Sequence, residues 1–342
     1  MTPWETLESR ARAVLPPDVF EYYACGAGEE ETLAENRRAW TNLKLLPHVL
    51  RDVSRVDTAT TVLGTRIAAP VLVAPTAFHR LAHPQGELAT AEGCAAAESL
   101  LVLSSRASIR IEDIAQRAGP WWFQVYVLRD RGLTRDMVQR AVRSGASALV
   151  LTGDTPFVGR KRRGRDRLAI SDEDFLANLE RLTDRALAEQ APDITFDDVA
   201  WLRELSGLPV LVKGVLRADD AQHCLDAGAA GVIVSNHGGR QLDGALATAE
   251  ALPEVVAAVG GRAEVLVDGG VRTGRDVLRA LALGARAVLV GRPILWGLAV
   301  DGAEGVRRVL DELRDDTGHA MALAGAASVA EVTADLLWHA NR

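Results

Sequence analysis

Two side chains with complementary chemistry stand three residues apart in the run Ser235–Gly244. His237 carries an imidazole that can accept a proton near neutral pH, and Arg240 carries a guanidinium that can hold a carboxylate through two parallel hydrogen bonds. The run follows the apolar sequence Gly231–Val234, so it stands where a buried strand opens into a loop. A base beside a carboxylate clamp is what reaction at the α-carbon of a small acid requires.

Eight short apolar runs recur along the chain and predict the elements that position these groups. Each run is almost continuously apolar, which is typical of parallel strands that are buried on both faces. The runs cover residues 70–74, 100–104, 122–126, 148–152, 209–213, 231–235, 264–268 and 287–291. Amphipathic stretches rich in Ala, Leu and Arg lie between them, and several end beside a glycine suited to a helix C-cap. We therefore predict an α/β fold, a closed (β/α)8 TIM barrel, with a doubly wound open sheet as the alternative.

The remaining segments frame this barrel in what we predict to be a single domain over 1–342. Residues 1–69 form an N-terminal extension that is helical over 4–14, residues 70–318 form the barrel, and residues 319–342 form a C-terminal helix. The most irregular stretch, 158–193, is inserted after the fourth strand and begins with a basic run. A long polar insert at this position is either an active-site lid or a surface loop, and the sequence favours neither.

The composition is that of an ordinary soluble globular protein, with 342 residues, 48% hydrophobic and 25% charged. The net charge of -7 argues against nucleic acid as a partner, and no apolar run is long enough to span a membrane. Cys25, Cys94 and Cys224 lack the spacing of a disulfide framework or a zinc site, so we expect no metal. The N-terminus lacks a signal-peptide pattern, which favours the cytoplasm.

Polar residues gather at the C-terminal ends of the predicted strands, where barrels of this kind carry their active sites. Tyr126 follows Gln124 by two positions, and Asp154 follows Thr152 by two, so each pair lies on one face of its strand. A carboxylate in this setting needs a cation, and protonated His237 is a candidate partner for Asp154.

The ends of the last two predicted strands suit a phosphate. Gly269 and Gly270 free backbone N–H groups to approach an anion, and Arg272 and Arg292 add positive charge. Amide and hydroxyl groups elsewhere at the barrel mouth would suit a phosphorylated cofactor with a heteroaromatic ring. A ring that becomes anionic on reduction would also supply the partner that the buried ammonium of Lys213 needs.

Longer stretches of the chain resemble the FMN-dependent α-hydroxy acid oxidase and dehydrogenase family, which includes glycolate oxidase, lactate oxidase, mandelate dehydrogenase and 4-hydroxymandelate oxidase. Residues 235–243 are similar to the signature of that family. The likeness covers nearly the whole chain, through 22–24, 34–37, 74–77, 82–84, 154–156 and 268–272. It implies FMN-dependent oxidation of an L-2-hydroxy acid to the 2-oxo acid, in a homo-oligomer such as a tetramer or octamer.

The resemblance also implies a role for each polar strand end. His237 would be the active-site base, taking either the α-proton or the hydroxyl proton, and Asp154 would stabilise its protonated form. Arg240 would bind the substrate carboxylate, Tyr126 would hydrogen-bond the substrate, and Tyr22 would help to close the pocket. The isoalloxazine and ribityl groups would contact Thr76, Ala77, Ser104, Gln124, Thr152 and Ser235, with Lys213 at the pyrimidine edge, and the phosphate end would contact Asp268, Gly269, Gly270, Arg272, Gly291 and Arg292.

The chain departs from the family pattern at two positions near the substrate. Arg106 stands where the family often has a large aromatic or apolar residue. It would either face a polar or acidic substrate side chain or, as we favour, turn into the insert and pair with a carboxylate at 172–174. The second carboxylate-binding arginine of the family aligns with Lys161, flanked by Arg160 and Arg162, which keeps the charge but changes the geometry.

Two features that the resemblance makes informative concern the electron acceptor. The insert lacks the apolar stretch of the membrane-attached dehydrogenases, and Ala77 near the flavin accompanies oxygen use in the family more often than glycine does. We therefore predict O2 as the acceptor and H2O2 as a product, with a dehydrogenase that uses a quinone or protein carrier as the alternative. The carboxylate site around Arg240 argues against an FMN-barrel isomerase of prenyl diphosphates. A catalytically silent flavin protein stays open because of Arg106 and Lys161.

Overall fold

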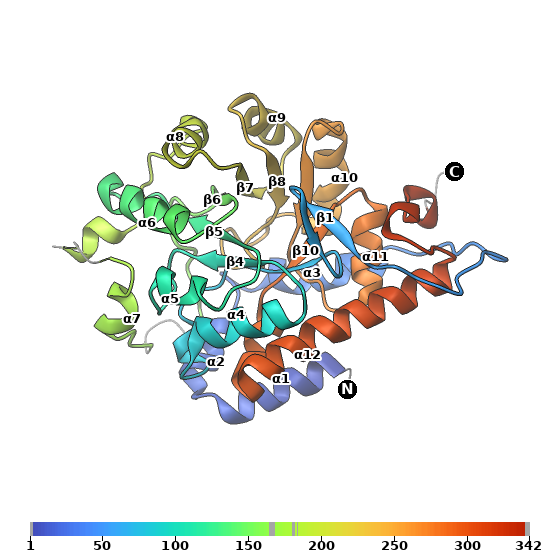
Figure 1. The fold of residues 1–342 in the computed structure, drawn as a ribbon, viewed down its shortest axis with the longest axis horizontal. Coiled ribbons are helices and arrows are strands. Elements are labelled where there is room, and N and C mark those ends of the chain that lie inside the picture. The colour runs from blue at the N-terminus through green and yellow to red at the C-terminus, as the bar shows by residue number, and fades with distance from the viewer. Residues whose placement is uncertain (1–2, 164–167, 180–181, 183, 339–342) are drawn as a thin grey trace.

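Eight parallel strands close into a barrel in the computed structural model, which describes residues 3–163, 168–179, 182 and 184–338 (Figure 1). Around the barrel the strands follow the order β10-β3-β4-β5-β6-β7-β8-β9. The barrel strands are β3 (Val71–Val73), β4 (Leu101–Ser104), β5 (Trp121–Val125), β6 (Leu149–Thr152), β7 (Val210–Val215), β8 (Gly231–Val234), β9 (Glu264–Val267) and β10 (Ala287–Val290). The predicted (β/α)8 barrel is confirmed, and the open sheet is excluded because β10 pairs with β3.

Helices cover the outside of the barrel, as the fold requires (Figure 1). They are α4 (Gly86–Ala96), α5 (Ile111–Ala115), α6 (Arg131–Arg143), α8 (Asp197–Ser206), α9 (Ala218–Asp226), α10 (Thr248–Val259), α11 (Gly274–Ala282) and α12 (Arg292–Ala324). The insert contains the helix α7 (Asp172–Leu176). Short 3-10 turns are η1 (His79–Leu81), η2 (Arg185–Ala188), η3 (Val329–Glu331) and η4 (Ala334–Leu336). Gly145, Gly228 and Gly284 follow α6, α9 and α11 with φ of 91°, 91° and 98°, which confirms the glycine caps. In the described part of the chain, no helix is long and apolar enough to cross a membrane.

Side chains that point into the barrel change from apolar to polar toward the C-terminal ends of the strands. Leu211 in β7, Ile233 in β8 and Trp122 in β5 belong to one buried apolar cluster that fills the barrel interior. Two residues further on, Lys213 and Ser235 face the same interior, since the Lys213 ammonium donates a hydrogen bond to the Ser235 hydroxyl at 2.8 Å. A period of two therefore places the functional groups in a polar layer on top of a packed core.

A hairpin that the sequence pattern did not predict lies at the opposite end of the barrel. Its strands, β1 (Thr60–Val62) and β2 (Thr65–Ile67), pair with each other and not with the barrel. Val62 is buried in the interior cluster, and the backbone N–H of Leu63 donates to the carboxylate of Glu264, the first residue of β9, at 2.9 Å. The hairpin thus closes the N-terminal mouth and leaves only the C-terminal mouth open.

The N-terminal extension is helical and reaches the C-terminal mouth. It contains α1 (Pro3–Val14), α2 (Pro17–Ala24) and α3 (Glu31–Asn42), and α1 packs along α12 (Figure 1). The indole N–H of Trp40 in α3 donates to the carbonyl of Gly269, in the loop after β9, at 2.7 Å. This contact ties the extension to the predicted phosphate loop.

The predicted separate helix over 319–342 is wrong. Residue 319 falls inside α12, which bends at Asp301 and Gly302 and then continues to Ala324. Gly325 ends α12 with a φ of 77°, a left-handed C-cap. The sequence prediction had continued the helix through this glycine. Beyond this glycine the described chain forms only the short turns η3 and η4, and residues 339–342 lie outside the described part.

Candidate active site

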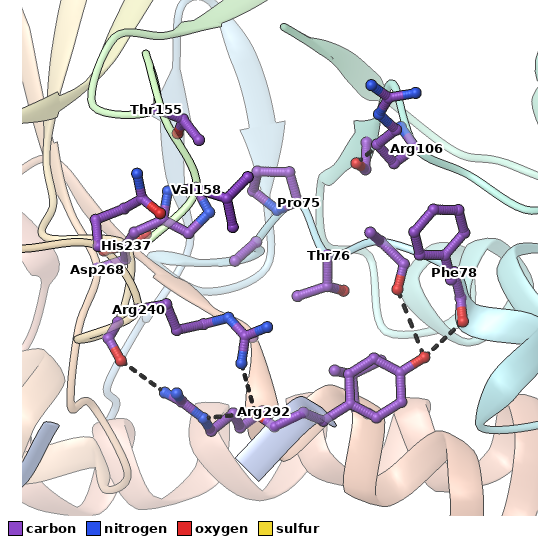
Figure 2. Close-up of a pocket in the computed structure, with 18 of the residues that line it drawn as sticks. Pro75, Thr76, Phe78, Arg106, Thr155, Val158, His237, Arg240, Asp268 and Arg292 are labelled. Carbon is purple, nitrogen blue, oxygen red and sulfur yellow. Dashed lines mark hydrogen bonds between the residues drawn. The ribbon is translucent and has the colours of Figure 1, made fainter. Parts of the chain in front are cut away.

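A cavity of about 390 Å³ opens at the C-terminal ends of the barrel strands, a size typical of small-molecule sites. Its wall combines the strand ends with α2 and with the described part of the insert (Figure 2). The predicted site residues that line it are Tyr22, Thr76, Ala77, Ser104, Arg106, Tyr126, Lys161, Lys213, His237, Arg240, Asp268, Gly269, Gly270, Arg272, Gly291 and Arg292. Four predicted site residues lie one layer behind the wall. Asp154 contacts His237, Gln124 contacts Ser104 and Ser235 contacts Lys213, all of which line the cavity, and Thr152 contacts Gln124.

The imidazole of His237 is held between a carboxylate and a phenol. Its Nδ1 lies 3.1 Å from Oδ1 of Asp154, and its Nε2 lies 3.5 Å from the hydroxyl of Tyr126. Because a carboxylate only accepts hydrogen bonds, Nδ1 carries the proton and Nε2 keeps a lone pair on the cavity side. The backbone of His237 has a left-handed φ of 58°, unusual for a residue other than glycine, and its N–H donates to the Ser235 hydroxyl at 3.0 Å.

Asp154 is built to remain ionised. Burial by itself would raise the pKa of this carboxyl, but His237 and Lys213, together with the Thr155 hydroxyl, hold the pKa below its ordinary value. The Thr155 hydroxyl donates to Oδ1 at 3.2 Å, while Oδ2 is buried without a hydrogen-bond partner among the described residues. An ionised carboxylate behind the imidazole stabilises the cation that forms when Nε2 takes a proton.

Lys213 has a partner in the protein that sequence reasoning missed. Its ammonium lies 2.9 Å from Oδ2 of Asp268, and both side chains are buried. The sequence pointed instead to an anionic ring, and Asp268 was assigned to the phosphate end. Lys213 lies in β7 and Asp268 directly follows β9, and both strands pair with β8, so the order of the strands brings the two side chains together. The second oxygen of Asp268, Oδ1, is buried with no hydrogen-bond partner in the described part of the chain.

A chain of amide and hydroxyl groups continues the polar layer on the other side of the barrel. The amide oxygen of Gln124 accepts from the Ser104 hydroxyl and from the backbone N–H of Ser105, each at 3.2 Å. The amide N–H of Gln124 donates to the Thr152 hydroxyl at 2.9 Å. These contacts fix the orientation of the Gln124 amide at the barrel interior, next to the cavity wall formed by Ser104.

Four cations crowd one end of the cavity. Burial, with Arg240 and Arg272 nearby, lowers the pKa of Arg292 to about 9. Burial, with Arg37 nearby, lowers the pKa of Arg272 to about 10. Burial, with Arg240 and Arg292 nearby, lowers the pKa of Lys161 to about 8. Buried cations that repel one another favour anionic ligands, so this end suits a carboxylate and a phosphate together.

Arg240 and Arg292 also anchor α2 above the cavity. Nη1 of Arg240 donates to the carbonyls of Tyr22 and Cys25 at 2.8 and 2.9 Å, and Nε of Arg292 donates to the carbonyl of Tyr23 at 3.0 Å. These are the last carbonyls of α2, which have no partner inside the helix and attract cations. Among the described residues Arg240 forms these bonds through Nη1 alone, so its other N–H groups remain for a ligand.

The basic run at the start of the insert is divided between the cavity and the surface. Lys161 lines the cavity, with its ammonium 5.7 Å from the centre of the Tyr22 ring. Arg160 is exposed, and Arg162 pairs with Glu29 on the outside at 2.5 Å. Of the three candidates for a second carboxylate binder, Lys161 is therefore the one in position.

The predicted pairing of Arg106 with a carboxylate at 172–174 is wrong. Those carboxylates contact Arg80 and Arg185 instead. The guanidinium of Arg106 turns inward, lines the cavity and donates to the carbonyl of Ala188 in the insert. The physical reason is the direction of the side chain: Asp172 and Glu173 project into solvent, whereas the Arg106 guanidinium is enclosed by the insert.

Three further residues support the site and carried little or no sequence signal. The hydroxyl of Tyr23 donates to the carbonyl of Phe78 at 2.5 Å, which fastens α2 to the loop after β3. His79 lies 2.5 Å from the Thr76 hydroxyl through Nε2 and is fully enclosed. Gln241, inside the 235–243 motif, donates to the carbonyl of Asp154 at 2.7 Å. Tyr23 and Gln241 stood in segments that the sequence had already singled out, 22–24 and 235–243, whereas His79 did not.

Comparisons with known proteins agree with this geometry. The family model for FMN-dependent dehydrogenases matches residues 11–339. An L-lactate oxidase from Nostoc sp. is 45% identical over 96% of both chains, and human 2-hydroxyacid oxidase 1 is 44% identical over 94% of this chain and 92% of its own. A solved structure of a mandelate oxidase variant with an FMN adduct superposes with a TM-score of 0.91 at 44% identity, covering 97% of this chain and 98% of that one. The predictions of an FMN cofactor and of a 2-hydroxy-acid oxidase are confirmed, and the chain belongs to the FMN-dependent dehydrogenase family.

Proposed function

We propose that the protein oxidises an L-2-hydroxy acid to the 2-oxo acid at His237, with bound FMN as first electron acceptor and O2 as the oxidant that regenerates it. The observation that carries this proposal is the pair of His237 and Asp154, which leaves Nε2 on the cavity side close to Arg240 (Figure 2). A base and a carboxylate-binding cation on one wall suit removal of a proton from a 2-hydroxy acid.

The cavity fits FMN on three observations. Arg272 and Arg292 are half-buried cations on the wall, which suits a phosphate. Gly269 and Gly270, with φ of 92° and 83°, bring backbone without side chains to the same wall. Oδ1 of Asp268 is a buried acceptor with no partner among the described residues, and it suits a hydroxyl donor of the cofactor. When bound, FMN supplies a two-electron acceptor for the electrons that leave the substrate.

Around the reacting carbon, each protein group has a separate task. Arg240 and Lys161 bind the substrate carboxylate, and Tyr126 hydrogen-bonds the substrate beside the imidazole. Nε2 of His237 then accepts a proton, from either the α-carbon or the hydroxyl, and Asp154 stabilises the resulting imidazolium. The ring of Tyr22 lies under both cations, with the Arg240 guanidinium 5.4 Å from its centre, and so keeps them on one side of the cavity.

The insert and α2 complete the proposed site by covering its mouth. Ile170, Phe175 and Ala188 of the insert line the cavity together with Tyr22 of α2. Apolar and aromatic groups at this position exclude water from the reacting centre, which supports the lid alternative for the described part of the insert.

The first experiment is the visible spectrum of the purified protein, mixed without oxygen with glycolate, L-lactate, L-mandelate and L-malate in turn. We expect a yellow protein whose flavin absorbance is bleached by at least one of these acids. A yellow protein that none of them bleaches would contradict the proposed reaction, and a colourless protein that does not bind added FMN would contradict the proposed site.

The acceptor is tested in a second experiment. With a 2-hydroxy acid that the protein oxidises, in the presence of air, we expect H2O2 to form in a one-to-one ratio with the 2-oxo acid. Fast flavin reduction combined with slow reoxidation by O2, and fast reoxidation by a quinone or a carrier protein, would favour the dehydrogenase alternative.

We also propose that the protein is a cytoplasmic homo-oligomer, a tetramer or octamer, built from single-domain subunits. Cys25, Cys94 and Cys224 are all free and buried, which suits a reducing compartment. The oligomeric state rests on the family resemblance. Light scattering on the FMN-loaded protein measures it directly, and a monomer would contradict it.

A further inference from the structure

Arg106 stands at the far end of the cavity from the proposed base. It lies two residues beyond Ser104 of β4, and its backbone N–H donates to the Ser104 hydroxyl at 3.1 Å, which fixes where the side chain begins. Figure 2 shows Arg106 on the opposite side of the pocket from His237 and Arg240. Arg106 therefore lines the part of the cavity that lies beyond the α-carbon of a 2-hydroxy acid whose α-carboxylate is bound at Arg240.

One nitrogen of this guanidinium has no partner. Nη2 donates to the carbonyl of Ala188, and Cζ lies 5.2 Å from the centre of the Phe175 ring. Nη1 is buried and makes no hydrogen bond to any residue that the structure describes. A buried donor of a charged group without an acceptor is unfavourable by more than a neutral one would be, so the guanidinium gains from an acceptor in the cavity that Arg106 lines.

The carboxylates at 172–174 and 189, which the structure describes, are already paired with other arginines. Asp172 contacts Arg185, while Glu173 and Asp174 contact Arg80. Glu189, which lines the cavity, pairs with Arg129 at 3.2 Å. The protein thus supplies Arg106 with a carbonyl and an aromatic ring but with no carboxylate among the described residues. Burial lowers the pKa of Arg106, as expected for a cation without a counter-ion.

The two cationic ends of the cavity are joined by the tyrosines between them. Tyr126 and Tyr22 each feel the charges of both Arg106 and Arg240. A substrate with its α-carboxylate at Arg240 and its α-carbon at His237 extends past these phenols toward Arg106. An apolar side chain there would leave the guanidinium without a counter-ion, whereas a second carboxylate would supply the missing negative charge.

We infer that the preferred substrates are 2-hydroxy dicarboxylic acids, whose second carboxylate binds the guanidinium of Arg106. This inference rests on the proposed function and specifies its substrate class. Malate and 2-hydroxyglutarate place the two carboxylates at two different separations, and comparison of the two measures the distance between the cationic ends.

The test is anaerobic flavin reduction by L-malate, L-2-hydroxyglutarate, L-lactate and L-mandelate, with kcat/KM measured in parallel. In the wild-type protein we expect at least one dicarboxylic acid to exceed lactate and mandelate by about 10-fold or more. Arg106→Leu should lower kcat/KM for that diacid by about 10²-fold and leave lactate within a few-fold. Arg106→Lys should fall between the two, because an ammonium keeps the charge and loses the fork. Arg117→Leu, which removes an exposed arginine paired with Glu92, is the matched control and should leave kcat/KM unchanged for both the diacid and lactate.

The outcomes separate this inference from the proposed function. The inference is overturned, and the proposed function stands, if lactate or mandelate reduces the flavin as well as any diacid does. The same holds if Arg106→Leu lowers kcat/KM equally for all four substrates. If no 2-hydroxy acid reduces the flavin, the proposed function itself fails. Should Arg106→Leu not fold, binding of oxaloacetate and of pyruvate to the wild-type protein is compared by flavin absorbance. Tighter binding of the diacid supports the inference, and equal binding overturns it.

Discussion

His237 and Asp154 meet across a strand that belongs to neither of them. Asp154 follows β6 and His237 follows β8, while β7 lies between the two, yet Nδ1 and Oδ1 are 3.1 Å apart. Gly214 in β7, with a φ of 105°, lies next to Asp154. Because glycine has no side chain, it leaves room for the Asp154 side chain beside β7. The pairing between β7 and β8 is irregular at this point, between Lys213 and Val215. The proposed catalytic pair therefore lies beside a local irregularity in the barrel.

The proposed base is tested by His237→Ala. Because Nε2 is the proposed proton acceptor and the proposed cofactor contacts lie elsewhere on the wall, we expect FMN to stay bound while the rate of flavin reduction falls by at least about 10²-fold. Stopped-flow absorbance under anaerobic conditions measures both the FMN content and the rate. A variant that reduces FMN at nearly the wild-type rate would exclude His237 as the base.

The role of Asp154 is tested by Asp154→Asn, which keeps the shape and removes the charge. The imidazolium then forms without a carboxylate behind it, so we expect flavin reduction to slow by about 10²-fold with little change in KM. The split between kcat and KM is the informative readout, because a defect in substrate binding would raise KM instead. Equal rates in the two proteins would show that the pair only fixes the orientation of the ring.

Much of this site could be predicted from the sequence because the period of a strand is two. Gln124 with Tyr126, and Thr152 with Asp154, fall on one face of their strands by spacing alone, and a parallel barrel gathers such strand ends at one mouth. The eight apolar runs gave the strands to within a few residues for the same reason. The local pattern thus determines which side chains point inward.

Which inward side chains touch is a property of the closed barrel, and local patterns do not contain it. Lys213 lies in β7 and Asp268 follows β9, and they become partners because both strands pair with β8. The contacts of Arg106 depend on how the insert folds back, which has no periodic signal. The prediction of a C-terminal helix over 319–342 was wrong for a different reason, because the single residue Gly325 ends α12.

The low pKa of Lys161 leads to a pH prediction. With a pKa of about 8, its ammonium is charged below that pH and neutral above it, so binding of the substrate carboxylate weakens as the pH rises through about 8. We expect kcat/KM to fall on the alkaline side with an apparent pKa near this value. The kcat should fall less, because a bound carboxylate stabilises the charged form.

Variants of Lys161 test this assignment directly. Lys161→Met should remove the alkaline limb and lower kcat/KM at neutral pH by roughly 10- to 100-fold, the cost of losing one partly buried charge contact. Lys161→Arg should keep the activity and shift the limb beyond the measurable range, since a guanidinium stays charged. An unchanged alkaline limb in Lys161→Met would assign the limb to another group.

The buried pair of Lys213 and Asp268 should stabilise the fold only as a pair. Lys213→Met leaves the carboxylate of Asp268 buried without its cation, so we expect the free energy of unfolding to fall by about 3–5 kcal/mol. Lys213→Met combined with Asp268→Asn should recover a large part of this loss, because no unpaired charge remains. Urea unfolding at two FMN concentrations separates this effect from weaker cofactor binding. A double variant as unstable as the sum of the single variants would show that the two side chains act independently.

The space that Gly214 leaves beside Asp154 is tested by Gly214→Ala. A Cβ at this position would lie 2.5 Å from the Cβ of Asp154, so the carboxylate must shift away from His237. We expect flavin reduction to slow by about 10-fold or more, through a residue that touches neither cofactor nor substrate. The matched control is Gly145→Ala, where φ is 91° and a Cβ would meet nothing within 4 Å. Both alanines carry the cost of a left-handed backbone, about 1–2 kcal/mol, so both should lower the free energy of unfolding. Only Gly214→Ala should also lower the rate, and equal rates in the two variants would exclude β7 as the support of the catalytic pair.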